Sequence, residues 1–378
     1  MSVDEPEGRM MNEAAQRLMD GSAWGDFCDT LKNAGSVILS DRAPADPLDR
    51  AEGFRYLTRL TRAALERFVE HADPRFPVLS RMIHETAKIG ADNPDNHYFN
   101  TAISGAEEYR ISGTRGTVFY LGFGTQAGNY GSTGKMVGTG YLEAADMEIG
   151  PDGRIEIAVS SEPKPGNWLP MRPETDMLIV RQTFLDQSTE VPADLRVERV
   201  GGDRAPTLVT PEGMEAGLRS ASFLVLGCAA MFANWAEGFR ERPNELPEFD
   251  PDLASSVGGD PNIRYYHGYW ELGPDEALVI DAAPPACPYW NFQLNNYWME
   301  SLEYRFHHIH VNKHTARYAP DGSVRVVVAH EDPGLPNWLE TTGHRRGTMC
   351  WRWVRATEYP VPRTRVVKLA DLRREARR

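Results

Sequence analysis

The chain has 378 residues, of which 41% are hydrophobic and 10% aromatic, a globular composition long enough for two domains with cores. Its formal net charge of -13 repels phosphate backbones and anionic lipids, which argues against nucleic-acid or membrane-surface partners. The four cysteines form no CxxC pair, which indicates no zinc knuckle and favours a reducing compartment. The first residues lack the apolar core of a signal peptide, so we expect a cytoplasmic protein.

Residues 1–88 are expected to form a helical N-terminal region. Between residues 46 and 74, Phe54, Leu57 and Leu60 recur at spacings of three and four, which predicts one apolar helix face. Asp46 can cap this helix, and Pro47 suits its first position.

Residues 89–209 change to short β-branched and aromatic runs separated by turn residues, which predicts a first β-sandwich that ends in a hairpin around residues 201–202. Residues 210–259 then hold a helix that opens at Thr210 and an acidic, proline-rich linker. The most apolar window of this helix, residues 221–233, is too short to span a bilayer, so we expect the helix to be buried between the domains. Residues 260–378 return to β texture and end in an extension.

The two β regions repeat each other. Pro94 and Tyr98 match Pro261 and Tyr265 at an offset of 167, and Q-x-x-N-Y occurs at residues 126–130 and 293–297. Pro-Asp-Gly and Asn-Trp-Leu follow in both regions, with offsets that grow only to 170. Ordered matches at a nearly fixed offset predict an internal duplication, with two domains of one design. In each copy we expect the tryptophan to cover the core and the asparagine to hold its loop.

The second copy, DGSVRVVVAHEDPGLPNWLETTGHRRGTMCWRWV, together with YRISGTRG at residues 109–116, resembles the bacterial family of domain of unknown function 1214. After Asn-Trp-Leu the first copy has the usual Pro170, whereas the second has Glu340. The resemblance covers about residues 50–360. It implies mainly β, jelly-roll-like sandwich repeats with added helices (α+β). It implies no settled activity, and no catalytic residue is carried over from it.

A histidine-rich segment in the second copy is the first candidate site. If residues 304–312 form a strand, His308 and His310 share one face. Two imidazoles at this spacing can bind a divalent metal with Glu300 or His330, or one imidazole can move a proton without any metal. The alternative without a function is a partly exposed, hydrogen-bonded strand face. We predict no organic cofactor.

Loops and aromatic residues complete the candidate site. His330 ends a strand next to two acids, where it is either functional or in an ion pair. Arg345 lies in a turn, where it either holds an anionic substrate group or is simply solvated. Aromatic and amide side chains predict a pocket wall, with core packing of about half of them as the alternative. The predicted substrate-binding residues are Asn296, Tyr297, Trp298, Trp290, Tyr304, His344 and Arg345.

These residues lead to three hypotheses. The first is an enzyme of lyase, hydratase, isomerase or hydrolase type that acts on a small, bulky organic molecule in the second repeat. Its acid–base residues are predicted to be His308, His310, His330 and Glu300. The second is a non-catalytic protein that binds a glycan or a hydrophobic metabolite through the aromatic residues. The third is an oligomeric scaffold.

Overall fold

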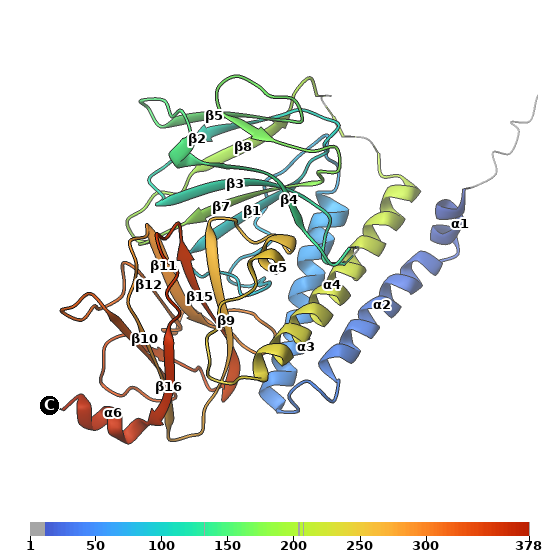
Figure 1. Cartoon of the computed structure of the whole chain (residues 1–378). Coiled ribbons are helices and arrows are strands. Elements are labelled where there is room, and N and C mark those ends of the chain that lie inside the picture. Colours follow the sequence, from blue (N-terminus) through green and yellow to red (C-terminus); the bar gives the residue numbers. More distant parts are fainter. Residues whose placement is uncertain (1–11, 132, 203–204, 207, 378) are drawn as a thin grey trace, which may run out of the picture.

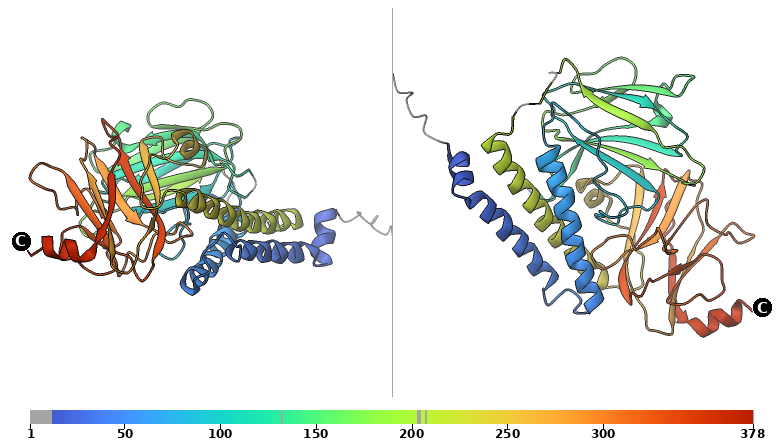
Figure 2. Two further views of the ribbon diagram at one scale, coloured as in Figure 1. Left: turned by 60° about the horizontal axis from the view of Figure 1, so that its bottom comes forward. Right: turned by 180° about the vertical axis from the view of Figure 1, so that it is seen from behind.

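The computed structural model describes residues 12–131, 133–202, 205–206 and 208–377. Two β-sandwiches lie next to each other, and a layer of long helices covers one flank of the pair (Figure 1). The other two views show the same separation of helices from sheets (Figure 2). The expected fold class is therefore confirmed, with a helical N-terminal region and a central helix between two β repeats.

The N-terminal helices are α1 (Glu13–Met19), α2 (Ser22–Ile38) and α3 (Pro47–Leu65), and α3 continues into a π-helical turn, η1 (Glu66–Glu70). Asp46 caps α3 as predicted, because its carboxylate accepts the Leu48 N–H at 2.9 Å. The predicted apolar face is only partly right. Leu60 is buried as expected, but Phe54 is exposed and Tyr56 is buried in its place.

The first sandwich contains β1 to β8. One sheet has the order β1-β7-β3-β4 and the other β6-β5-β2-β8. The predicted hairpin around residues 201–202 is wrong, because β8 pairs with the distant β2 and no strand follows it among the described residues before α4. The strands are β1 (Asn96–Ala102), β2 (Tyr109–Thr114), β3 (Tyr120–Ala127), β4 (Val137–Glu143), β5 (Arg154–Ser160), β6 (Trp168–Pro170), β7 (Met177–Thr183) and β8 (Asp194–Arg199), with a 3-10 turn η2 (Ala144–Asp146) after β4.

The central helix α4 (Pro211–Arg240) begins where the sequence predicted, with the Thr210 hydroxyl accepting the Gly213 N–H at 3.1 Å. It packs against α2 and α3 and against both sandwiches. Among the described helices, α4 alone has the length and hydropathy of a membrane span, and half of its most apolar window is buried inside the protein. A short helix, α5 (Pro251–Ser256), follows.

The second sandwich repeats the first, strand for strand. Its sheets have the orders β9-β15-β11-β12 and β14-β13-β10-β16, which match those of the first sandwich when each strand number is raised by eight. The predicted duplication is therefore confirmed. The elements are β9 (Ile263–Glu271), β10 (Glu276–Ala282), β11 (Tyr289–Leu294), β12 (His310–Asn312), β13 (Val324–Ala329), β14 (Trp338–Glu340), β15 (Arg346–Val354), β16 (Arg363–Lys368) and α6 (Leu369–Glu375).

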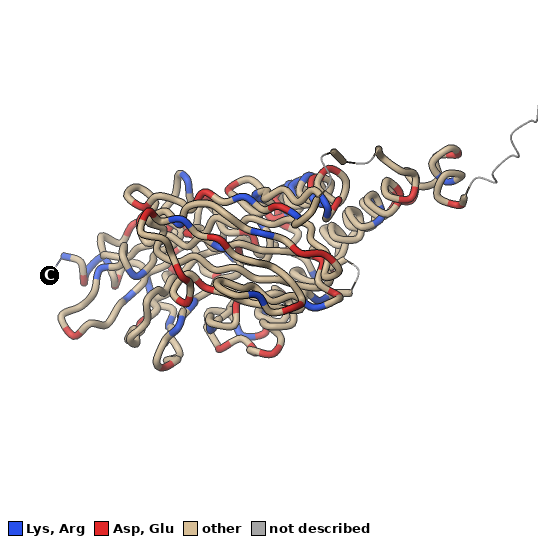
Figure 3. The backbone as a smooth tube through the Cα atoms, turned by 90° about the horizontal axis from the view of Figure 1, so that it is seen from above, with Lys and Arg blue, Asp and Glu red and all other residues tan. Residues whose placement is uncertain are grey.

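The repeated Asn-Trp-Leu loops have the predicted roles. The Asn337 amide donates to the carbonyl oxygens of Arg317 and Arg325 at 2.8 and 2.9 Å, and Asn167 holds the equivalent loop in the first sandwich. Trp338 is half-buried and its indole N–H donates to Ala329. Basic and acidic residues are intermingled along the backbone of both sandwiches (Figure 3).

Candidate functional site

The histidine-rich segment is not the strand that the sequence suggested. The strand β12 covers only His310–Asn312, and residues 304–306 form a turn in which the Glu303 carbonyl accepts the His307 N–H at 3.1 Å. Arg305 closes this turn through its ion pair with the Glu303 carboxylate. His308 therefore lies before β12 with an exposed side chain, and the expected strand over residues 304–312 is wrong at its start.

His310 is the predicted residue whose contacts reach the other repeat. Its Nε2 lies 3.1 Å from Oδ1 of Asp95, and the other oxygen of this carboxylate accepts the Tyr289 hydroxyl at 2.6 Å. No group of three or more His, Cys, Asp or Glu side chains among the described residues is arranged to hold a metal ion.

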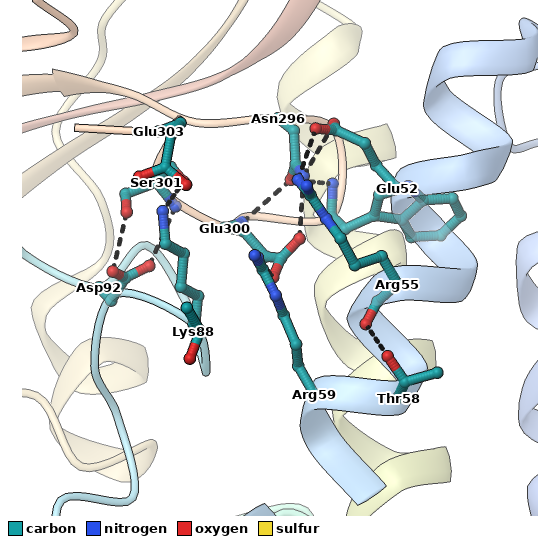
Figure 4. A network of polar contacts seen from close by, with 12 residues as sticks. Glu52, Arg55, Thr58, Arg59, Lys88, Asp92, Asn296, Glu300, Ser301 and Glu303 are labelled. Carbon is teal, nitrogen blue, oxygen red and sulfur yellow. Dashed lines mark hydrogen bonds and ion pairs between the residues drawn. The ribbon is translucent and has the colours of Figure 1, made fainter. Parts of the chain in front are cut away.

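Glu300 and Asn296 belong to a buried polar network that attaches α3 to the second sandwich (Figure 4). The Arg59 guanidinium donates to Glu300 at 2.7 Å, and the Asn296 amide donates to Glu300 and Glu52 at 3.1 and 3.0 Å. Burial raises the pKa of Glu300 and outweighs the opposing charge of Arg59. These contacts join two elements and leave no free face on either side chain for a substrate.

Two of the three predicted loop residues have protein partners. His344 is buried, with Nε2 at 2.7 Å from the Glu52 carboxylate. His330 Nδ1 lies 2.8 Å from the Thr341 hydroxyl. Arg345 is exposed, and its described contact is a backbone bond from the Leu272 N–H.

The predicted aromatic wall is distributed between cores and helix contacts. Trp290 stacks on Trp351 at 4.9 Å inside the second sandwich, and Trp298 donates to the Asp49 carbonyl in α3 at 2.8 Å. The Tyr297 hydroxyl donates to Glu237 of α4 at 2.8 Å. Tyr304 is half-buried under the Lys88 ammonium. None of the predicted site residues lines the aromatic-walled cavity inside the described structure.

That cavity lies where the two sandwiches meet α4, and its volume is about 190 Å³. An aromatic cluster forms one wall, with ring centroids 5.0–5.7 Å apart along the series Tyr130, Phe232, Trp235 and Phe249. The β1 and β7 strands of the first sandwich and the β9 and β15 strands of the second complete the lining. The cavity is therefore shared between the repeats.

A tyrosine–arginine pair from each repeat faces this cavity. Tyr98 lies opposite Arg181 across β1 and β7, and Tyr265 lies opposite Arg352 across β9 and β15. In each repeat the tyrosine oxygen accepts the backbone N–H of the residue five positions earlier, at 3.1 Å in the first and 3.2 Å in the second. The duplication has therefore placed the same two-strand feature on both sides of the cavity.

The two repeats also exchange equivalent hydrogen bonds across their interface. Arg181 donates to the Gly258 carbonyl at 2.7 Å, and Arg352 donates to the carbonyl of Ala91, which lies 167 positions before Gly258. This offset is the offset of the duplication. The interface therefore has an approximate two-fold symmetry, with one arginine from each sandwich reaching into the other.

Arg352 is buried, and its hydrogen bonds within the described part of the chain go to neutral oxygens. Its Nη1 donates to Gln293 at 2.6 Å and to Asn291 at 3.2 Å, in addition to the Ala91 carbonyl. Neither Arg352 nor Arg181 forms an ion pair within the described part of the chain. A buried guanidinium without a carboxylate partner is costly, which makes this end of the cavity attractive to an anion.

His267 completes the cavity wall as a neutral imidazole. It stacks between Phe239 and Tyr265, with ring centroids at 5.5 and 6.1 Å. Burial, together with the charge of Arg352, lowers the pKa of His267 to about 3. Its Nδ1 is buried without a hydrogen-bond partner. The cavity thus offers apolar faces, the unpaired His267 Nδ1, and charged side chains that include Arg181, Arg352, Asp92 and Asp176.

Two sequence signals could have located this site. Each is an arginine in an otherwise apolar strand, Arg181 in MLIVRQT and Arg352 in MCWRWV. Because buried strands rarely contain a charged residue without a reason, an arginine in such a strand indicates a position with a specific role.

The chain is similar to one described protein family and to solved structures. The family described as "Protein of unknown function (DUF1214)" matches residues 277–358. An uncharacterized protein from Burkholderia cenocepacia, with a crystal structure, is 55% identical, with 94% of this chain and 99% of that chain covered and a TM-score of 0.93. The chain belongs to the DUF1214 family. This confirms the resemblance that the sequence suggested.

A second solved structure, the VPA0106 protein from Vibrio parahaemolyticus, is 10% identical to this chain. The match covers 90% of this chain and 100% of the Vibrio chain, with a TM-score of 0.48. Similarity at this level supports no argument about function. No protein with a curated description matches the sequence.

Proposed function

We propose that the cavity between the two repeats binds a small organic molecule with an apolar body. Its volume of about 190 Å³ exceeds the cavity of roughly 150 Å³ that holds a benzene molecule in other proteins. Its lining combines aromatic and aliphatic side chains with a few polar groups, the usual composition of small-molecule sites. The observation that carries the proposal is this shared cavity with a buried cation in its wall.

The exposure of the lining residues indicates how a ligand enters. Phe68, Met82 and Asn129 line the cavity and are partly exposed, whereas Arg352, His267 and Tyr289 line it and are buried. The mouth therefore lies on the side of η1, and the polar groups lie at the inner end. A ligand with one polar group would enter with this group first.

A cavity-filling substitution tests the proposal. Met136 lines the cavity, whereas its neighbour Val137 is exposed and does not. We expect the full chain to bind benzoate or benzamide in calorimetry, and Met136→Trp to lower the affinity at least ~10-fold while Val137→Trp leaves it unchanged. Absence of binding of both probes by the unchanged protein, or equal affinities of the two variants, would contradict the proposal.

An acid–base enzyme of lyase or hydrolase type is the second candidate, and one contact chain favours it. His310 is linked through Asp95 to Tyr289 in the cavity wall, so it is the predicted histidine with a path to a bound molecule. His308, His330 and Glu300 have no such path in their described contacts.

Mass spectrometry of small organic acids incubated with the protein tests this candidate. Conversion that is lost in His310→Gln and retained in the exposed variant His308→Gln supports it, because only His310 connects to the cavity. Conversion that survives His310→Gln rules out this histidine as the acid–base residue.

A further inference from the structure

We infer that the ligand is a monocarboxylic acid whose carboxylate is bound by Arg352. This inference rests on the proposed binding function of the cavity and names its chemical class. Three observations carry it, namely the charge of Arg352, the donors that Arg352 leaves free, and a difference between the repeats that affects only one of the two arginines.

The first observation is an uncompensated charge. Arg352 is only 5% exposed, and its described acceptors are two side-chain amides and one backbone carbonyl. Neither Asp92 nor Asp95 of the first repeat has a described hydrogen bond or ion pair with Arg352. Asp95 accepts hydrogen bonds from Tyr289 and Asn312 and pairs with His310, and both Asp92 oxygens accept from Ser301. The guanidinium charge is therefore available to a ligand.

The second observation is the set of free donors. A guanidinium has five N–H groups, and the described contacts of Arg352 use both hydrogens of Nη1 and one of Nη2. The Nε–H and one Nη2 hydrogen remain, which suits the two oxygens of one carboxylate. Since one positive charge is uncompensated, a monoanion balances it, whereas a phosphate ester would bring about −1.5 to −2 charges.

The third observation is the different surroundings of the two equivalent arginines. Asn93 and Asp260 occupy the same repeat position, 167 residues apart, and each donates its backbone N–H to the cavity tyrosine of its own repeat. The charge of Asp260 acts on Arg181. On the other side, Asn93 is neutral and is joined to Arg352 through Asn291. Arg181 is therefore partly neutralised by the protein, and Arg352 is not.

The apolar body of the acid then lies along the aromatic wall. The Tyr265 ring centroid is 5.9 Å from the Arg352 guanidinium, and His267 stacks on the same tyrosine. A carboxylate held at Arg352 points its substituent towards these rings and towards the aromatic cluster of Tyr130, Phe232, Trp235 and Phe249. Benzoate has the size and the charge that this arrangement accepts, and benzamide has the same shape without the charge.

Calorimetry with this probe pair tests the inference on the full chain. We expect benzoate to bind at least ~10-fold more tightly than benzamide. Asn93→Asp places a carboxylate near Arg352, so it is expected to lower benzoate affinity at least ~10-fold and to leave benzamide affinity unchanged. Asp260→Asn removes the acid near Arg181 and is expected to raise benzoate affinity. Asn33→Asp, an exposed change of the same charge on α2, is the control and is expected to change neither affinity.

The possible outcomes separate this inference from the proposed function. Equal affinity for benzoate and benzamide in the unchanged protein overturns the carboxylate assignment and leaves the cavity as a binding site. Tighter binding of inorganic phosphate than of benzoate overturns the monocarboxylate class. Binding of neither aromatic probe overturns the proposed function itself. If Asn93→Asp fails to fold, the benzoate-to-benzamide ratio of the unchanged protein still decides.

Discussion

At the scale of single residues, Gly53 fixes the distance between α3 and the second sandwich. A Cβ at this position would lie 2.7 Å from the Trp298 ring and from the Ile38 side chain, both of which are fully buried. Neither neighbour can move away without disturbing a packed core. The helix therefore approaches the sandwich closely because this side chain is absent.

A pair of glycine substitutions tests this reading. Gly53→Ala is expected to lower the free energy of unfolding by about 1–3 kcal/mol, because the added methyl group overpacks the contact. Gly25→Ala, in α2, meets nothing within 4 Å and is expected to raise stability by roughly 0.5–1 kcal/mol through helix propensity. Urea unfolding followed by circular dichroism measures both. A loss of stability in Gly25→Ala, or none in Gly53→Ala, would contradict the argument.

The predicted start of the histidine-rich strand was wrong for a local reason. Alternation along a strand assigned His308 and His310 to one face, but the Glu303–Arg305 ion pair stabilises a turn in that segment. A pattern of period two cannot show where a strand begins, so the predicted strand began six residues before the observed one.

At the scale of elements, an ion pair between Glu52 and His344 attaches α3 to the turn before β15. Burial favours the uncharged form of both groups, but their mutual hydrogen bond and charge outweigh it, so the pKa of His344 is raised and the pKa of Glu52 is lowered. The contribution of His344 is complete below its unfolded pKa of about 6.5 and is lost as the pH rises through its folded pKa. That of Glu52 is complete above about 4.3 and is lost as the pH falls through its folded pKa.

The pair therefore contributes most between about pH 4.3 and 6.5. We expect Glu52→Gln to lower the free energy of unfolding by about 3–5 kcal/mol at pH 5.5, because a buried charge loses its partner, and by less at pH 9, because the His344 contribution is lost as the pH rises. Burial raises the pKa of Asp49 to about 6, and this effect is present in both proteins and largely cancels in their difference.

The control for this pH prediction is an exposed ion pair. Glu331 pairs with Arg373 on the surface, and Glu331→Gln is expected to change stability by less than about 1 kcal/mol at either pH. Urea unfolding at the two pH values gives the comparison. An equal loss for Glu52→Gln at pH 5.5 and 9 would show that the ion pair is not the source of its contribution.

At the scale of the whole molecule, the two sandwiches are held together by equivalent hydrogen bonds. Besides the two arginines, Tyr120 donates to Asp260 at 2.9 Å and Tyr289 donates to Asp95 at 2.6 Å, each across the repeat boundary. All four residues of these bonds are buried. Because these contacts and α4 connect both cores, the repeats are expected to unfold together.

Tyr289→Phe tests this cooperativity. It leaves a buried carboxylate with one donor fewer, so it is expected to lower stability by about 1.5–3 kcal/mol. Six of the nine tryptophans lie in residues 260–378, so fluorescence reports mainly the second repeat, whereas circular dichroism reports both. We expect the two thermal transitions to coincide and to shift by the same amount. A fluorescence transition that shifts alone would show that the repeats unfold separately.

The sequence predicted the two-repeat architecture but not the cavity site, because a repeat pattern does not show which sheet faces meet. Tyr98 and Tyr265 aligned at the constant offset, and the structure places both at equivalent positions of the cavity. Arg181 and Arg352 are 171 residues apart, outside the range of the other matches, and their proximity arises only when two sheets from different repeats face each other. Periodicity describes one strand at a time and does not encode which faces meet.

The exchanged contacts of Arg181 and Arg352 also bear on how such a protein can evolve. Two separate copies of one sandwich would make them across a true symmetry axis, and a substitution would then alter both sides at once. Joined in one polypeptide, the copies can diverge independently, as Asn93 and Asp260 have done. In an ancestral homodimer, a ligand at the symmetric interface would bind in two equivalent orientations. In the fused chain, one of these orientations can be favoured.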